Sequence, residues 1–130
     1  KRVQEVQCGG LVGVGTFLDP SLTKADGLIG NLVGKPNMLP ETLSELTLET
    51  HFFERVVGTK ELIEVDKTQK GEVLLLDVGT AITTGSVASV GKDVVTLQLG
   101  RPVCAEQGFS AAISRKIAGR WRLIGYGTIR

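Results

Sequence analysis

Beyond Pro40, apolar and polar residues of the chain alternate with a period of two. Residues 46–51 and 95–99 both follow this pattern, and Val73–Leu76 is a continuous apolar run. Because successive side chains of a strand point to opposite faces of a sheet, the first two stretches are typical of half-buried strands. The apolar run is typical of a buried strand. The pattern therefore predicts a β-structure after residue 40.

Two short glycine-containing segments separate pairs of these strand candidates. Gly91-Lys92-Asp93 lies between residues 86–90 and 94–97, and Ile117-Ala118-Gly119 lies between residues 111–114 and 121–124. Short loops that contain glycine between two β-patterns are typical of hairpins. The second hairpin brings Arg115, Lys116 and Arg120 close to its tip.

Little of the chain has the pattern of a helix. The one helix-like stretch, Glu54 to Ile63, is interrupted by Gly58, and seventeen glycines punctuate the short strand candidates. Such a pattern predicts an all-β fold, either an antiparallel barrel or a sandwich. At 130 residues with 42% apolar content, the chain is long enough for a domain with its own core.

The first forty residues differ from the rest. Gly9–Thr16 and Leu28–Val33 are short strand candidates, and Gly34–Pro40, with its two prolines, has the composition of a linker or domain boundary. We expect the apolar residues between Val3 and Val33 to pack against the remaining domain or to pair with a neighbouring chain.

Charge is distributed unevenly along the chain. From Glu41 to Asp77 nine acidic residues accompany four cationic ones, a net charge of −5, whereas residues 107–130 carry five cationic residues and no acid. The formal total is +1, so any site for a polyanion must be a local patch. The cationic segment holds the only tryptophan, Trp121, between Arg120 and Arg122.

The cysteines and the histidine give no sign of a catalytic or metal site. Cys8 and Cys104 are too few and too far apart for a disulfide framework or a zinc cluster, and we expect two buried, reduced thiols. His51, the only histidine, is expected to be a packed or capping side chain because catalysis requires convergent partners.

Nucleotide-binding and acid–base motifs are also absent. A P-loop has four residues between its glycines before Gly-Lys-Ser/Thr; the span from Gly85 to Gly91-Lys92 has one too many, and that from Gly30 to Gly34-Lys35 one too few. The carboxylates at 61, 64 and 66 lie among lysines, as in a solvated loop. We expect no catalytic activity, no metal and no nucleotide site in this chain.

Seven segments carry a resemblance to a known family: Gly9–Thr16, Leu18–Pro20, Leu22–Asp26, Arg55–Gly58, Gly71–Leu74, Ile113–Arg115 and Arg120–Gly125. In order and at similar spacing, they resemble the gamma subunit of translation initiation factor 2, a family related to elongation factor Tu. The glycine-rich start resembles the closing strands of that family's second domain, and later segments resemble its third domain. The segment from Val57 to Gly71 is compact, as in archaeal members.

The resemblance implies an antiparallel Greek-key β-barrel of the translation-factor domain III type over residues 39–130. Residues 1–38 would be the C-terminal strands of domain II and a linker. In the family, the complete subunit binds GTP with magnesium and delivers initiator methionyl-tRNA to the small ribosomal subunit. It also joins the alpha and beta subunits of the factor. No GTPase domain matches this chain, so its expected role is to support that domain and to contact RNA or protein partners in the cytoplasm.

Four cationic residues are the candidate contact site: Arg115, Lys116, Arg120 and Arg122. Strict alternation places Trp121 and Leu123 in the core and Arg120 and Arg122 on the outer face. The four side chains are predicted to touch ribosomal RNA or tRNA backbone. An equally supported alternative is that they pair with acids of the stretch 41–77 or with the GTPase domain.

Two other classes of function remain open. The domain can serve as a docking module for an assembly factor or another initiation factor without RNA contact, using an exposed face around residues 41–54. A small barrel that binds single-stranded RNA by itself needs exposed aromatic residues interleaved with basic ones. With four Phe, one Tyr and one Trp, most of them expected in the core, that class is disfavoured. No apolar run approaches the ~20 residues of a membrane span, so no membrane partner is expected.

Overall fold

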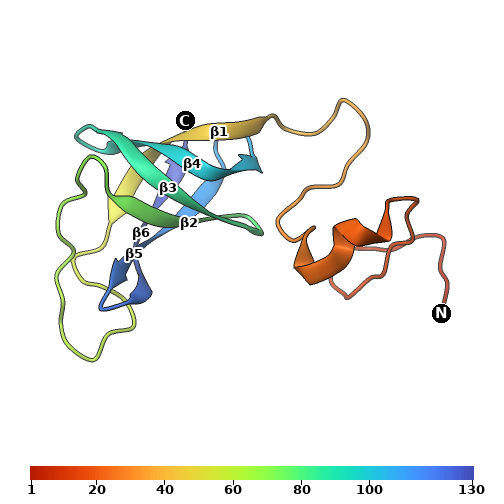
Figure 1. Ribbon diagram of the computed structural model, residues 1–130, viewed down its shortest axis with the longest axis horizontal. Helices are drawn as coiled ribbons and strands as arrows, with labels where there is room; N and C mark the ends of the chain where they lie inside the picture. Colours follow the sequence, from red (N-terminus) through yellow and green to blue (C-terminus); the bar gives the residue numbers. More distant parts are fainter.

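A computed structural model describes all residues, 1–130, and shows one closed six-stranded barrel (Figure 1). A short 3-10 helix, η1, precedes the barrel at Pro20–Asp26. The strands are β1 Thr42–Phe52, β2 Val73–Val78, β3 Ala81–Val90, β4 Val94–Cys104, β5 Ser110–Ile117 and β6 Arg120–Ile129. No helix of the structure has the length and apolar character needed to cross a bilayer.

The strand order around the barrel is β1-β4-β3-β2-β5-β6, and every pairing is antiparallel. Strands β2, β3 and β4 follow one another through hairpins. β1, which is joined to β2 by a long connection, lies beside β4, and this is the Greek-key arrangement. Pairing of β1 with β6 closes the sheet. The prediction of an all-β Greek-key barrel is therefore confirmed, as are the two hairpins.

The core consists of side chains from alternate positions of the strands. Leu46 and Leu48 of β1, Leu74 and Leu76 of β2 and Leu97 of β4 are almost completely buried. Fifteen apolar residues form a single buried cluster inside the barrel. Burial of this cluster is the main term that stabilises the fold, because each fully buried large aliphatic side chain contributes about 1.5–3 kcal/mol.

Two glycines of β6 allow β1 to lie very close. A Cβ atom added at Gly125 would lie 2.4 Å from the carbonyl oxygen of His51, and one at Gly127 would lie 2.9 Å from Cβ of Leu48. No side chain fits at such distances, so glycine is required where β6 crosses β1 to close the barrel.

The connection between β1 and β2 is a loop, not the helix that the stretch from Glu54 to Ile63 suggested. Its first part is closed by an isolated bridge between Arg55 and Glu64. Val56 is buried, and Ile63 and Val65 pack against the core. The loop folds back through a turn at Val57 and Gly58 and so places its apolar residues against the core, which a regular helix with Gly58 at its centre would not do.

Residues 1–41 lie outside the barrel and contain no strand, so the strand predictions for Gly9–Thr16 and Leu28–Val33 are wrong for this chain. The physical reason is that a strand needs a sheet edge to pair with, and a closed barrel offers none. Most of the segment is exposed. Figure 1 shows it at the opposite end of the barrel from the β1–β2 loop and the β5–β6 hairpin.

Candidate functional site

The cationic residues predicted from the sequence lie on the β5–β6 hairpin. Its turn is formed by Ala118 and Gly119, both with positive φ, 48° and 78°. Positive φ at both central residues is typical of a type I′ turn, whose twist matches that of a tight hairpin. The hairpin projects beyond the barrel next to the β1–β2 loop (Figure 1).

The register of the hairpin divides the four cationic residues between its two faces. Arg115 pairs with Arg122, and Lys116 pairs with Trp121. Residues directly opposite each other in an antiparallel pair share a face, and neighbours along a strand lie on opposite faces. Arg115, Arg122 and Arg120 therefore share one face, and Lys116 and Trp121 lie on the other.

Arg115 is bound to the β1–β2 connection. Its Nε lies 2.5 Å from Oε1 of Glu72, its Nη2 lies 3.2 Å from Oε2 of the same carboxylate, and its Nη1 donates to the carbonyl of Asp66 at 2.9 Å. The hydroxyl of Thr68 lies 3.4 Å from Nη2. For Arg115, the alternative that it pairs with an acid of the stretch 41–77 is confirmed.

The other three cations have different surroundings. Arg122 is half-buried with Nη1 close to Gly58 of the same loop. Arg120, the first residue of β6, and Lys116 are exposed. Of the four candidates, Lys116 and Arg120 are the two whose side chains are open to a polyanion. RNA contact by any of the four stays a prediction.

The prediction that Trp121 and Leu123 lie in the core is wrong. Trp121 is 38% exposed and lies below the Nζ atom of Lys116, 6.0 Å from the ring centroid, whereas Ile124 is fully buried. The reason is a β-bulge: Ile113 pairs with Gly125, and the next residue, Ser114, pairs with Leu123. Ile124 is thus an extra residue, and an extra residue inverts the alternation of the strand beyond it.

A second aromatic group lies farther along β6 on the outside of the barrel. Tyr126 is 47% exposed and stacks on His51 of β1, with centroids 5.1 Å apart. Phe53 lies 6.3 Å from the same ring. The expectation that most aromatic residues are needed for the core is therefore wrong. The cross-strand pair of His51 with Tyr126 depends on register, which sequence alone did not supply.

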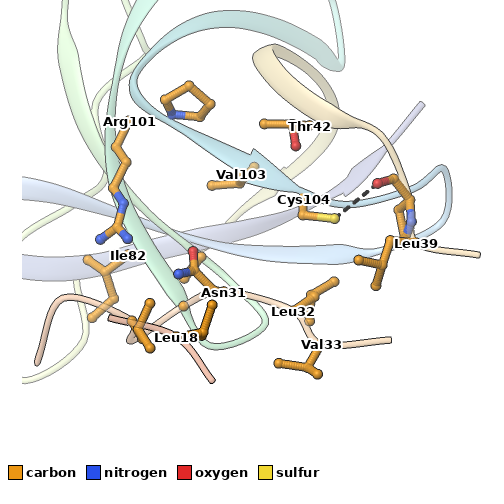
Figure 2. Close-up of a pocket in the computed structure, with 15 residues that line it drawn as sticks. Leu18, Asn31, Leu32, Val33, Leu39, Thr42, Ile82, Arg101, Val103 and Cys104 are labelled. Atoms are coloured by element: carbon orange, nitrogen blue, oxygen red, sulfur yellow. Dashed lines mark hydrogen bonds between the residues drawn. The ribbon is translucent and has the colours of Figure 1, made fainter. Parts of the chain in front are cut away.

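A cleft of about 590 Å³ lies at the opposite end of the barrel, between residues 18–42 and β3 and β4. Figure 2 shows Leu18, Leu32 and Leu39 of the N-terminal segment facing Ile82 and Val103 of the barrel. Two hydrogen bonds connect the sides: Sγ of Cys104 donates to the carbonyl of Pro40 at 3.1 Å, and Nη2 of Arg101 to that of Ile29 at 3.4 Å.

The chemistry of this cleft is that of a packing surface. Nine of its fifteen lining residues are hydrophobic. Arg101 is its one charged residue, so it holds no pair of groups for acid–base catalysis. The expected packing of Val3–Val33 on the barrel is thus limited to the part around the cleft, since Val3, Leu11 and Phe17 are exposed.

The other residues that the sequence analysis weighed for disulfide, metal or phosphate binding lie far apart in the structure. Both cysteines are free, but Cys8 is exposed and Cys104 is half-buried, so the expectation of two buried thiols is wrong. No cluster of three or more His, Cys, Asp or Glu residues has the geometry of a metal site. Gly85 lies inside β3, and Gly91 and Lys92 lie at the β3–β4 turn, which is not the strand-to-helix loop that binds phosphate.

One carboxyl group has a shifted pKa. The backbone N–H of Ser21 donates to Oδ1 of Asp19 at 2.8 Å, and this bond, with a smaller contribution from the Ser21 hydroxyl, lowers the pKa of Asp19 below its ordinary value of 3.8. The effect belongs to capping of η1, whose N-cap is Asp19. It has no connection with the hairpin.

The fold and the hairpin together define the chain as a small closed Greek-key barrel with a cationic hairpin at one end. A family model described as initiation factor eIF2 gamma, C terminal, matches residues 44–129. The chain therefore belongs to the family of eIF2 gamma C-terminal domains.

Curated relatives extend the similarity to residues before the barrel. The chain is 60% identical over 128 residues to translation initiation factor 2 subunit gamma of Thermococcus kodakarensis, covering 98% of this chain. It is 56% identical to the protein of that name from Pyrococcus furiosus and 55% identical to that from Aeropyrum pernix. These organisms are archaea, as the resemblance implied. The chain spans 31% of the length of each of these relatives.

Proposed function

We propose that this chain is the non-catalytic C-terminal part of a translation initiation factor gamma subunit, and that its β5–β6 hairpin contacts the backbone of RNA through Lys116 and Arg120. The observation that carries the proposal is the exposure of these two cations on a hairpin without acidic residues. Their charges are available to phosphates, whereas Arg115 is engaged by Glu72.

The remaining cation of the set, Arg122, has a different role in this proposal. It lies half-buried against the β1–β2 loop, close to Gly58. There it holds the hairpin in place beside Arg115, so that Lys116 and Arg120 project from a supported ribbon. A long-range electrostatic contribution of Arg122 to RNA binding is compatible with this position.

For the complete subunit, the family supports a wider proposal. Together with its GTPase domain, the protein would bind GTP and magnesium and deliver initiator methionyl-tRNA to the small ribosomal subunit, as part of a complex with alpha and beta subunits in the cytoplasm. Residues 1–38 would then be the closing strands of the second domain. Their exposed apolar residues and missing sheet partners support that assignment.

Charge reversal at the exposed cations tests the RNA contact. We expect Lys116→Glu with Arg120→Glu to weaken binding of the chain to duplex or single-stranded RNA and to reduce the salt dependence of the affinity. The slope of log K against log salt should fall by roughly 0.7–0.9 for each phosphate that the variant no longer neutralises. Lys92→Glu, at the tip of the β3–β4 hairpin, is the matched control. An unchanged slope in the double variant would exclude the contact.

A docking function without RNA contact is the second candidate. It is favoured by exposed apolar residues of the β1–β2 loop, Val57 and Leu62, which are 51% and 76% exposed. Retention of an assembly factor or another initiation factor by the parent chain, and its abolition by Leu62→Ser, would support this function. Unchanged retention by that variant would count against this surface.

A further inference from the structure

The open face of the β5–β6 hairpin carries an exposed aromatic ring, Trp121, opposite the cation Lys116, and a second exposed cation, Arg120, lies beside the turn on the other face. We propose that this end of the hairpin binds an unpaired RNA nucleotide, whose base stacks on Trp121 while its phosphates contact Lys116 and Arg120. This inference rests on the proposed RNA contact and adds the mode of recognition. It concerns a site of three side chains at the end of the hairpin.

The hairpin is a free two-stranded ribbon at this point. Pairing of β5 with β2 ends at Ser114, and pairing of β6 with β1 ends at Gly125. From Arg115 to Arg122 the two strands pair with each other and with no other strand. Both faces of the ribbon are therefore accessible unless another segment covers them.

One of the two faces is partly covered. Arg115 is bound by Glu72, Asp66 and Thr68, and the guanidinium of Arg122 lies beside Gly58. The β1–β2 connection thus covers this face at Arg115 and Arg122 and leaves Arg120, nearer the turn, exposed. The opposite face, with Lys116 and Trp121, remains open to solvent.

The exposed ring has the properties of a base-stacking platform. Lys116 lies at the outer limit of cation–π distance, 6.0 Å from the centroid, and its long flexible side chain can turn toward a phosphate when a base takes its place. Stacking on tryptophan accepts any base, because every base has a π-face. Arg120 precedes Trp121 in β6 and so lies on the other face of the ribbon, where its exposed side chain beside the turn supplies the second cation for a neighbouring phosphate.

Size and charge favour RNA over a protein as the ligand of this site. A specific protein interface needs roughly 20–30 residues on each side, far more than the end of a two-stranded ribbon supplies. The hairpin carries cations and no acid from Gln107 onward. A single ring flanked by cations is sufficient for one nucleotide.

The fluorescence of Trp121 tests the proposal directly, since it is the only tryptophan of the chain. We expect single-stranded RNA to quench this emission to saturation, whereas duplex RNA and inorganic polyphosphate leave it unchanged. Trp121→Leu, which keeps an apolar side chain without a ring, should weaken single-strand binding roughly tenfold, with Trp121→Phe in between. Phe17→Leu, at an exposed aromatic residue outside the barrel, should have no effect.

The outcomes separate this proposal from the one on which it rests. If single-stranded and duplex RNA bind with equal affinity and the fluorescence of Trp121 is not quenched, stacking is overturned, whereas the contact with the RNA backbone is still supported. Quenching that persists in the Lys116→Glu, Arg120→Glu variant contradicts the backbone contact instead. Absence of binding to either RNA overturns both. Circular dichroism of each variant checks that the barrel is folded, and Trp121→Phe supplies the comparison if Trp121→Leu does not fold.

Discussion

The ion pair between Arg115 and Glu72 leads to a quantitative prediction about the free energy of unfolding of the barrel. The guanidinium forms a two-point contact with the carboxylate and also donates to the Asp66 carbonyl, so one side chain attaches the β1–β2 connection to the hairpin. Side chains of Arg115 and Glu72 are 15% and 21% exposed. We expect Arg115→Met to loosen this attachment and to destabilise the barrel.

The magnitude follows from the burial of the pair. Exposed ion pairs contribute about 0.2–1 kcal/mol, whereas removing one partner of a fully buried pair costs about 3–5 kcal/mol. With both side chains mostly but not fully buried, Arg115→Met or Glu72→Gln should each lower the free energy of unfolding by about 2 kcal/mol. The double variant should be destabilised by less than the sum, with a coupling energy of about 1 kcal/mol.

Urea denaturation followed by far-ultraviolet circular dichroism measures this effect. With a slope of about 2 kcal/mol per molar urea, a decrease of about 2 kcal/mol moves the midpoint by about 1 M. Arg115→Lys is the matched control, because it keeps the charge but not the two-point contact, and it should fall between parent and Arg115→Met. Strictly additive effects, or an unchanged midpoint in Arg115→Met, would refute the reasoning. Weaker RNA binding at unchanged stability would instead assign Arg115 to the RNA contact.

Three further predictions concern other parts of the chain. Gly125→Ala should destabilise the barrel by at least about 2 kcal/mol in the same denaturation assay, because the new methyl group would clash with the carbonyl of His51; parental stability would exclude this steric role. Ala118→Asn should raise the melting temperature, by about 0.5–1 kcal/mol of stability, since Asn accepts the positive φ of this turn position at lower cost; a lower melting temperature would contradict it. The lowered pKa of Asp19 means that its bond to Ser21 stabilises η1 above the ordinary pKa and is lost as pH falls through the lower, folded value. The amide resonance of Ser21 followed by NMR should titrate below pH 3.8, and a midpoint at or above that pH would disprove the cap.

Much of the barrel was predictable because its strands obey simple alternation. Leu46, Leu48 and Leu97 are buried as their spacing indicated, and both predicted hairpins formed around their glycine-containing turns. Alternation shows which face of a strand is apolar, and in a closed barrel the apolar faces of all strands point to the same interior. The fold class therefore required no knowledge of distant contacts.

Segments whose structure depends on a distant partner were predicted less well. Gly9–Thr16 has the pattern of a strand but finds no sheet edge in this chain. Glu54–Ile63 resembles a helix locally but forms a loop that folds back on itself, since Val56 and Ile63 pack against the core. In both cases the local preference was weaker than the long-range packing.

The sequence by itself determined that the last residues form a cationic hairpin with one tryptophan. Its composition, its turn and its family resemblance are all properties of the chain read in order. Only the tertiary structure decided the role of each side chain. Arg115 meets a carboxylate 43 residues away, and the extra residue at Ile124 turns Trp121 out of the core. A bulge and an ion pair depend on the register between strands, and register follows from how the whole barrel closes.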